Sequence, residues 1–348
     1  MIKILHTADW HLGAPLQGYG EKLRQALDTV PGKILEVLRQ ENCDLVLLAG
    51  DVFDCTYTPY TYQAVYDMLK AMAVPVFVTP GNHDFCSPDS PWNKELWPEN
   101  VHIFRSQQIE SVALPELDCR IYGAGFDGVE CPALLEGFVA EGSEKYAIGI
   151  FHGDATQTNS QYNPITKAQV QTSYLDYLAL GHIHKADQFI AGKTLCGWSG
   201  CPMGRGYDET GEKGVYIVTL DETATIRFHP LNTPRFYDLQ AEPKDLDSVL
   251  PPVASNDYYR VTLIGSCEKP DMERMREEYS RFPNLELRDA TSRPVDVWSS
   301  LGEDNFEGAY FRLLRQAMES ANEEEKEEIQ LAAEISRRLL DGQEVVLP

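Results

Sequence analysis

The sequence of 348 residues contains no apolar run that approaches the roughly 20 residues of a membrane-spanning helix. Its first residues, Met1 to His6, enter an alternating strand pattern directly, without the basic stretch and cleavage site of a signal peptide. The eight cysteines are scattered and form no Cys-x-x-Cys pair, so neither a zinc ribbon nor a dithiol redox motif is expected. These absences predict a cytoplasmic protein with reduced thiols and no membrane association.

Positive charge is also scarce. The chain has 30 lysines and arginines against 54 aspartates and glutamates, which gives a net charge of −24. A protein that holds nucleic acid on its own surface is usually basic, because its cations displace the counterions of the phosphates. Any contact with DNA is therefore expected to be local, metal-mediated or supplied by a partner. DNA binding by the isolated chain should be weak and should fall steeply with salt.

Strand and helix patterns alternate along the first part of the chain. Hydrophobic residues make up 43% of the sequence, which is enough for a proper core. Strands are predicted at 2–6, 44–49, 75–79, 146–151 and 177–180, with helical spacing at 20–40, disturbed by Pro31-Gly32, and at 60–73. The strands are continuous apolar runs, as in sheets covered on both faces. This alternation predicts an α/β sandwich.

The pattern changes after about residue 185. Strands are expected near 187–190, 194–197, 214–220 and 224–230, and then at 258–264 and 285–287, with helices at 271–281, 303–320 and 323–341. A boundary is expected near Asn232-Thr233-Pro234. The predicted organisation is a large domain at 1–232, a small α+β capping domain at 233–300 and a C-terminal helical segment at 301–348.

Five loops share one feature: each follows an apolar strand and presents Asp, Asn or His at the strand's carboxyl end. They are Asp9-x-His11, Gly50-Asp51-x-x-Asp54, Gly81-Asn82-His83-Asp84, His152-Gly153 and Gly181-His182-x-His184. In open α/β sheets this edge is where sites are built. Two divalent ions about 3.5–4 Å apart need a bridging carboxylate and further oxygen and nitrogen ligands, which this set supplies. Carboxylate, amide and imidazole ligands suit Mn²⁺, Fe or Zn²⁺ better than Ca²⁺. They do not distinguish among these three metals, of which we expect Mn²⁺.

These five motifs, in this order, resemble the calcineurin-like metallophosphoesterase superfamily. The stretches from His6 to Gly13 and from Leu48 to Asp54 resemble its SbcD-type DNA repair nuclease branch more particularly. The resemblance is strong over about residues 1–230 and loose beyond them. It implies a four-layer α/β/β/α sandwich, a small α+β cap and C-terminal helices.

The resemblance also implies roles for single residues. Asp9, His11, Asp51 and His184 would hold the first metal ion, and Asn82, His152 and His182 would complete the second, with Asp51 bridging. The ions would polarise the phosphate and activate a water for in-line attack. His83 would donate a proton to the leaving oxygen, and Asp54 would orient His83.

For three candidate residues, namely His83, Asp54 and Arg205, an alternative role stays open. His83 could be a structural ligand, and Asp54 could only form a turn. Repair nucleases of this family often have a histidine in place of Asp54, which leaves phosphoester hydrolysis intact but questions processive exonuclease activity. Arg205, in a glycine-rich loop, is a candidate for binding a substrate phosphate, although a partner carboxylate in a structural loop is nearly as well supported.

The function that follows is hydrolysis of DNA phosphodiester bonds by a two-metal nuclease subunit of a repair complex. The resemblance implies an SbcC-type ATPase partner that docks through C-terminal helices; alternatively, their apolar stripes cover their own domain. Family members often form homodimers, although this sequence shows no exposed apolar stripe that would require a homodimer. Two other functions stay open: a phosphatase or phosphodiesterase for small molecules or nucleotides, and a non-catalytic DNA-end-binding scaffold. A non-catalytic scaffold is expected to have lost one or more of the metal-ligating residues, and none of them is missing from this sequence.

Overall fold

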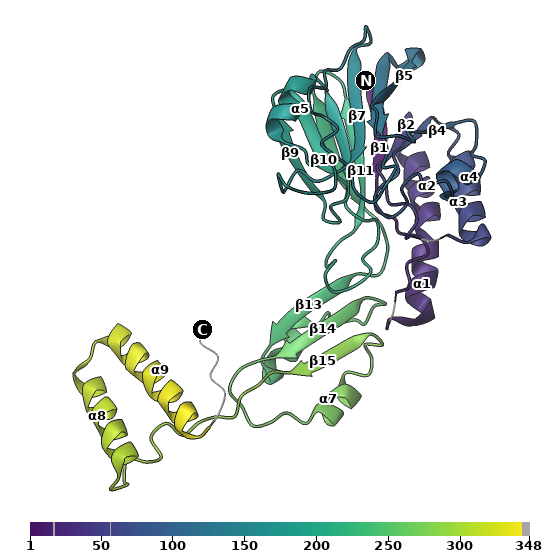
Figure 1. Cartoon of the computed structure of the whole chain (residues 1–348). Helices are drawn as coiled ribbons and strands as arrows, with labels where there is room; N and C mark the ends of the chain where they lie inside the picture. Colours follow the sequence, from purple (N-terminus) through teal and green to yellow (C-terminus); the bar gives the residue numbers. More distant parts are fainter. Residues whose placement is uncertain (17, 56, 343–348) are drawn as a thin grey trace. The chain divides into compact units, whose positions relative to one another are not determined.

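The computed structural model describes residues 1–16, 18–55 and 57–342, and the chain divides into two compact units (Figure 1). The first unit comprises Met1–Asp238 and Ser255–Arg260, and the second comprises Leu239–Ala254 and Val261–Pro348. The division predicted at residues 232 and 300 stays a prediction. Within the described residues, no helix has the length and apolar character that crossing a membrane requires.

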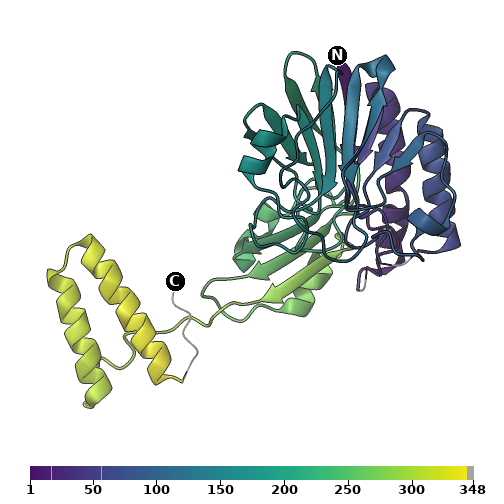
Figure 2. The ribbon, with the colours of Figure 1, turned by 45° about the horizontal axis from the view of Figure 1, so that its top comes forward.

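The first unit contains two six-stranded sheets (Figures 1 and 2). One sheet has the order β12-β11-β1-β2-β3-β4, with strands Ala224–Pro230, Gly214–Leu220, Ile2–Thr7, Leu45–Leu48, Val76–Val78 and Val101–Ile103. The other has the order β5-β6-β7-β8-β10-β9, with strands Glu110–Leu114, Cys119–Ala124, Tyr146–His152, Tyr177–Gly181, Thr194–Trp198 and Asp187–Ala191. β1, β2 and β3 run parallel to one another, as do β7 and β8, so their carboxyl ends point the same way within each sheet.

Three apolar layers hold this unit together. Between the sheets, Ile4 and Leu47 of the first sheet pack with Ile148 and Ala179 of the second. The outer face of the first sheet packs on helices α1 (Gly20–Asp28), α2 (Val30–Glu41) and α3 (Pro59–Met72). The second sheet packs on α5 (Lys167–Ser173). These three apolar layers join four layers of secondary structure, helices, sheet, sheet and helix, which form the predicted α/β/β/α sandwich.

The helical region at 20–40 is two helices. The break lies at Thr29, two residues before the Pro31-Gly32 pair that was expected to disturb a single helix. Pro31 lies in the first turn of α2, where its missing N–H would have no intrahelical partner and so costs no hydrogen bond. A short helix at Pro91–Lys94 (α4) and 3₁₀ turns at Pro115–Leu117 and Pro243–Asp245 complete the connections.

The remaining elements form a three-stranded sheet and a helical hairpin. The sheet has the order β13-β14-β15, with strands Phe236–Ala241, Tyr258–Leu263 and Leu285–Asp289, and is accompanied by α6 (Leu246–Val249) and α7 (Met272–Glu278). Helices α8 (Phe306–Ser320) and α9 (Glu323–Leu340) pack through Phe311 and Ala333. Phe306, Leu313 and Leu339 are exposed, so the apolar residues of the hairpin are only partly covered.

Candidate metal centre

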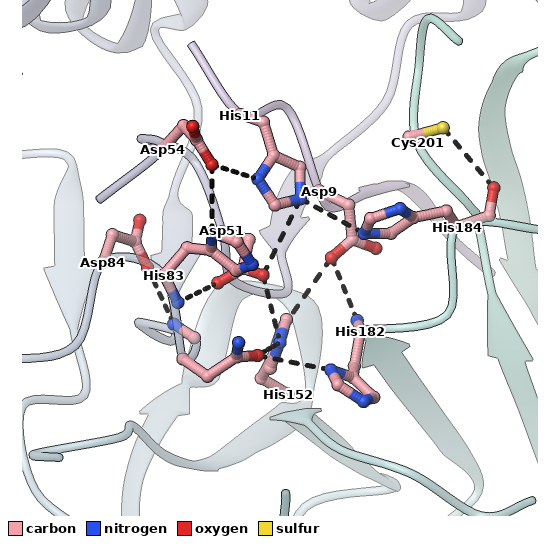
Figure 3. Close-up of polar contacts among 12 residues, drawn as sticks. Asp9, His11, Asp51, Asp54, His83, Asp84, His152, His182, His184 and Cys201 are labelled. Carbon is pink, nitrogen blue, oxygen red and sulfur yellow. Dashed lines mark hydrogen bonds and ion pairs between the residues drawn. The ribbon is translucent and has the colours of Figure 1, made fainter. Parts of the chain in front are cut away.

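The five predicted loops meet at one edge of the sandwich (Figure 3). The side chains singled out in the sequence come from the carboxyl ends of strands in both sheets: Asp9 and His11 after β1, Asp51 and Asp54 after β2, Asn82 and His83 after β3, His152 at the end of β7, and His182 and His184 after β8. The structure brings together all seven residues predicted as metal ligands, with His83 and Asp54 beside them. The site therefore draws on both sheets.

The backbone is strained at these positions. Asp9, His11, Asp51 and His182 have φ angles of 55°, 46°, 52° and 88°, in the left-handed region that residues with a Cβ avoid. Such residues cost on the order of 1–3 kcal/mol each and persist where the surroundings fix them. The amides of Asp9 and His11 donate to the carbonyls of Gly50 and Asp51 at 2.9 Å, which ties the first two loops together.

Two glycines make room for the side chains. A Cβ at Gly50, whose φ is +94°, would lie 2.4 Å from Nδ1 of His152, and one at Gly81 would lie 2.2 Å from Oδ1 of Asp51. Both distances are far below van der Waals contact. Glycine at these two positions lets the backbone of one loop approach the ligands of another.

Asp9, His11 and His184 form one group whose side-chain atoms lie close enough together to hold a metal ion. Nδ1 of His11 lies 3.3 Å from a carboxylate oxygen of Asp54, and Nδ1 of His184 lies 2.7 Å from one of Glu209. A carboxylate accepts a hydrogen bond, so in the neutral rings these Nδ1 atoms carry the hydrogens. The two Nε2 atoms are then unprotonated and face each other at 3.1 Å. Burial lowers the pKa of His11, which favours its neutral ring.

Asp9 has an unsatisfied oxygen beside this group. Its Oδ1 accepts the amide hydrogen of His182 at 3.0 Å, whereas the buried Oδ2 has no hydrogen-bond partner among the described residues. A buried carboxylate oxygen without a partner is costly. A cation beside the two unprotonated imidazole nitrogens would remove that cost.

The second group consists of Asn82, His152 and His182. Nδ1 of His152 donates to the carbonyl of Ala49 at 3.0 Å, which leaves Nε2 unprotonated in the neutral ring. That Nε2 lies 3.0 Å from Oδ1 of Asn82, and Nδ1 of His182 lies 3.2 Å from the same oxygen. Burial, reinforced by His152, lowers the pKa of His182 to about 4. Nε2 of His152 and Oδ1 of Asn82 therefore present lone pairs to each other.

Asp51 lies between the two groups. Its Oδ2 is 3.4 Å from Nε2 of His152 and 3.7 Å from Nε2 of His11, and it is almost fully buried. Two ligands bound at about 2.0–2.2 Å to one ion lie about 3.0–3.5 Å apart at tetrahedral to octahedral angles. Most of the distances between neighbouring donor atoms fall within this range. The donor set thus fits two divalent cations that share Asp51.

His83 borders this cluster and is partly exposed. Its Nδ1 lies 2.9 Å from Oδ1 of Asp54, the same oxygen that contacts His11. The bond to Asp54 raises the pKa of His83, and the bonds from His11 and His83 hold the pKa of Asp54 well below its usual range. Asp54 therefore positions two histidines at once. The alternative role for Asp54, which was only to form a turn, would not explain these two contacts.

Asp84 belongs to one of the motifs but received no role from the sequence. One of its oxygens accepts the amides of Val52 and Phe53, and the other accepts the amide of Gly81. It is buried, and burial together with the charge of Asp51 raises its pKa to about 6. Asp84 thus fixes the loop after β3 against the loop after β2. The signal was its place in the motif directly after His83.

Arg205 contacts a carboxylate of its own loop. Its guanidinium bonds to Glu209 at 2.6 Å, and its Nη2 also lies 3.1 Å from Nδ1 of His184. This is the structural alternative foreseen for Arg205, and contact of Arg205 with a substrate phosphate stays a prediction. The sequence analysis missed Glu209 as the partner of His184. The only signal for it was an acidic residue closing a glycine-rich loop after the last histidine motif.

The contact of Glu209 with His184 gives a first testable expectation. Glu209→Gln should weaken metal binding about 10–100-fold, because the partner that orients a ligating histidine and raises its basicity is lost. Activity should return at high metal concentration. Titration of the metal-free protein with Mn²⁺ measures the affinity, and Asp208→Asn, which changes an exposed neighbouring carboxylate, is the matched control. An unchanged affinity of Glu209→Gln for Mn²⁺ would show that Glu209 only stabilises its own loop and does not support metal binding by His184.

Comparison with known proteins agrees with this geometry. The family model for calcineurin-like phosphoesterases matches residues 2–186, which is more than half of the chain. The chain is 29% identical over 234 residues to the uncharacterized metallophosphoesterase YhaO of Bacillus subtilis (strain 168), an alignment that covers 62% of this chain and 57% of that protein. The chain therefore spans less than two thirds of the length of this relative.

Two further similarities extend the comparison. The SbcD component of the SbcCD nuclease of Escherichia coli (strain K12) is 27% identical over 349 residues, covering 85% of this chain and 84% of that protein. A solved dimetal phosphatase from Danio rerio has 14% identity and a TM-score of 0.45, covering 65% of this chain and 96% of that one. With its buried clusters of histidine and aspartate and a matching family model, the chain belongs to the calcineurin-like phosphoesterases and is a metal-dependent phosphoesterase.

Proposed function

We propose that this protein hydrolyses DNA phosphodiester bonds as the nuclease subunit of a repair complex. The observation that carries the phosphodiesterase part is the sharing of Asp51 between two groups of convergent donor atoms. DNA as the substrate is supported by the likeness to the SbcD component of the Escherichia coli SbcCD nuclease, which extends over most of both chains.

Each ligand has a proposed place. Asp9, His11 and His184 hold one ion, Asn82, His152 and His182 hold the other, and Asp51 contacts both. We favour Mn²⁺, with Fe and Zn²⁺ as alternatives for the same ligands. When bound, the ions polarise the phosphoryl group and supply the nucleophilic water.

His83 is the proposed proton donor to the leaving oxygen, and Asp54 orients it. The support is geometric: Nδ1 of His83 is held at 2.9 Å by Asp54, and the ring is partly exposed beside the ligands. A group that protonates the leaving oxygen must face both the substrate and the centre where bonds change. The position of His83 meets both needs.

The acidic character of the chain supports a partner. With a net charge of −24, the isolated protein would repel DNA over most of its surface. An SbcC-type ATPase, as the name of the Escherichia coli relative indicates for that protein, would supply the missing affinity. The partly exposed apolar residues of α8 and α9 are the proposed docking element, and a homodimer is a further proposed assembly.

The same charge favours a second candidate function. Hydrolysis of small phosphoesters, such as nucleotides, needs no extended basic surface, because the two ions alone bind the phosphate. The metal centre would serve either substrate class. The two functions differ in whether DNA, as well as a small phosphoester, can reach the metal centre.

Hydrolysis of two substrates by the Mn²⁺-loaded protein separates these functions. We expect cleavage of both end-labelled DNA and bis-p-nitrophenyl phosphate, at rates that EDTA removes. Cleavage of the small diester with intact DNA, even after addition of an SbcC-type ATPase, would favour the small-molecule function. Failure to cleave either substrate would contradict the proposal as a whole.

A further inference from the structure

A cavity of about 290 Å³ opens beside His83, between the segments that follow β2 and β3. It is lined by Phe53, Cys55, Tyr57, His83, Asp84, Phe85, Ser87, Asp89, Ser90 and Pro91. Ligand pockets for small molecules measure about 300–1,000 Å³, so the volume of this cavity is just below the lower limit of that range. It has room for one ring system with its substituents and none for a duplex.

The walls of the cavity offer flat aromatic surfaces. Phe53 is buried and packs against Tyr57 and Trp92, with ring centroids 5.8 Å and 5.5 Å apart. The hydroxyl of Tyr57 donates to Glu95 at 3.2 Å, which fixes the orientation of the ring. Phe85 adds a third, partly exposed ring. The partly exposed rings of Tyr57 and Phe85 can stack on a planar group, whereas Phe53, which is 1% exposed, only supports the ring of Tyr57.

The polar groups of the cavity suit a neutral ligand. None of its described lining residues is lysine or arginine, whereas Asp89 places a carboxylate at the rim. Ser90 is 7% exposed, and its hydroxyl has no hydrogen-bond partner within the described part of the chain. The lining therefore offers a phosphate no lysine or arginine, and its polar groups can bond to the N–H and C=O groups of a heterocycle. A nucleobase combines these groups with a stacking face.

The place of the cavity relative to His83 defines its role. His83 lines the cavity and, under the function proposed above, donates the proton to the leaving oxygen. The body of the leaving group must therefore extend from the metal ions past His83. We propose that this cavity is a leaving-group subsite that binds the nucleoside next to the scissile phosphate through its base. The proposal rests on the proposed function and names the substrate class of that site.

Binding of an uncharged nucleoside tests the subsite apart from catalysis. The full chain, stripped of metal with EDTA, is titrated with 2-aminopurine riboside, whose fluorescence is quenched when its base stacks. We expect saturable quenching that is weakened about tenfold or more in Tyr57→Leu and in Phe85→Leu, the loss typical of one stacking partner. Tyr57→Phe keeps the ring and should keep the affinity.

Tyr60→Leu is the matched control, because Tyr60 is an exposed tyrosine that does not line the cavity. Absence of saturable quenching, or equal affinity in the two leucine variants and the parent protein, overturns the subsite. That failure is distinct from failure of the proposed function, which shows as absent diester hydrolysis by the Mn²⁺-loaded parent protein. With a dinucleotide substrate, Tyr57→Leu should raise KM more than it lowers kcat.

Discussion

Asp51→Asn should reduce bound Mn²⁺ from two ions to one or none per chain and lower kcat by at least about 10³-fold. Asp51 lies between the two groups of donor atoms, with its Oδ2 3.4 Å from Nε2 of His152 and 3.7 Å from Nε2 of His11. An amide is a weaker, uncharged ligand, so both ions lose a shared negative charge. Loss of one ion removes the electrostatic stabilisation that this ion gives to the transition state.

The substitution is chosen to spare the fold. Oδ1 of Asp51 accepts the amide hydrogen of His83 at 2.9 Å, and the amide oxygen of asparagine can accept the same bond. Elemental analysis after manganese loading and kcat on bis-p-nitrophenyl phosphate are the two readouts, with thermal unfolding as a check on folding. Asp127→Asn, at an exposed aspartate outside the site, is the control. Two ions per chain with full activity in Asp51→Asn would remove Asp51 from the centre.

The convergence of the candidate metal centre was largely predictable, because its side chains belong to short motifs that each follow one apolar strand. An apolar run such as 44–49 predicts a strand, and parallel strands end at one edge, so Asp9 and Asp51 had to approach each other. The pairing between sheets was not predictable in this way. Nε2 of His11 lies 3.1 Å from that of His184, 173 residues along the chain, and only packing of the two sheets brings them together.

Most of the elements that the sequence analysis missed are short, exposed or irregular, but it also missed β6 (Cys119–Ala124), which is six residues long and almost entirely buried. Strands β4 (Val101–Ile103) and β5 (Glu110–Leu114) are three and five residues long and lack a fully buried face, so neither shows a clear period. β13 (Phe236–Ala241) was missed because the region was taken as a boundary. Glu209 was missed for another reason: its contact with His184 depends on the path of an irregular loop, which no periodicity encodes.

The role of His83 leads to a prediction that depends on the leaving group. His83→Asn should lower kcat on DNA by about 10²–10⁴-fold, the usual contribution of a positioned acid. On bis-p-nitrophenyl phosphate the loss should be much smaller, because a p-nitrophenolate leaves without a proton. The alternative role, a structural ligand of a metal ion, predicts equal losses on both substrates and a lower metal content. The ratio of the two losses therefore separates proton donation from ligation.

Asp54→Asn provides the companion measurement. Asp54 holds Nδ1 of His83 at 2.9 Å and Nδ1 of His11 at 3.3 Å, so its loss should lower activity on DNA less than the loss of His83 does. It should also remove part of the upward shift in the pKa of His83, since the bond to Asp54 is the largest cause of that shift. Both variants should keep two Mn²⁺ ions per chain. If His83→Asn cleaves DNA as fast as the parent protein at full metal occupancy, another group must protonate the leaving oxygen, and the cavity beside His83 would lose its assignment to the leaving group.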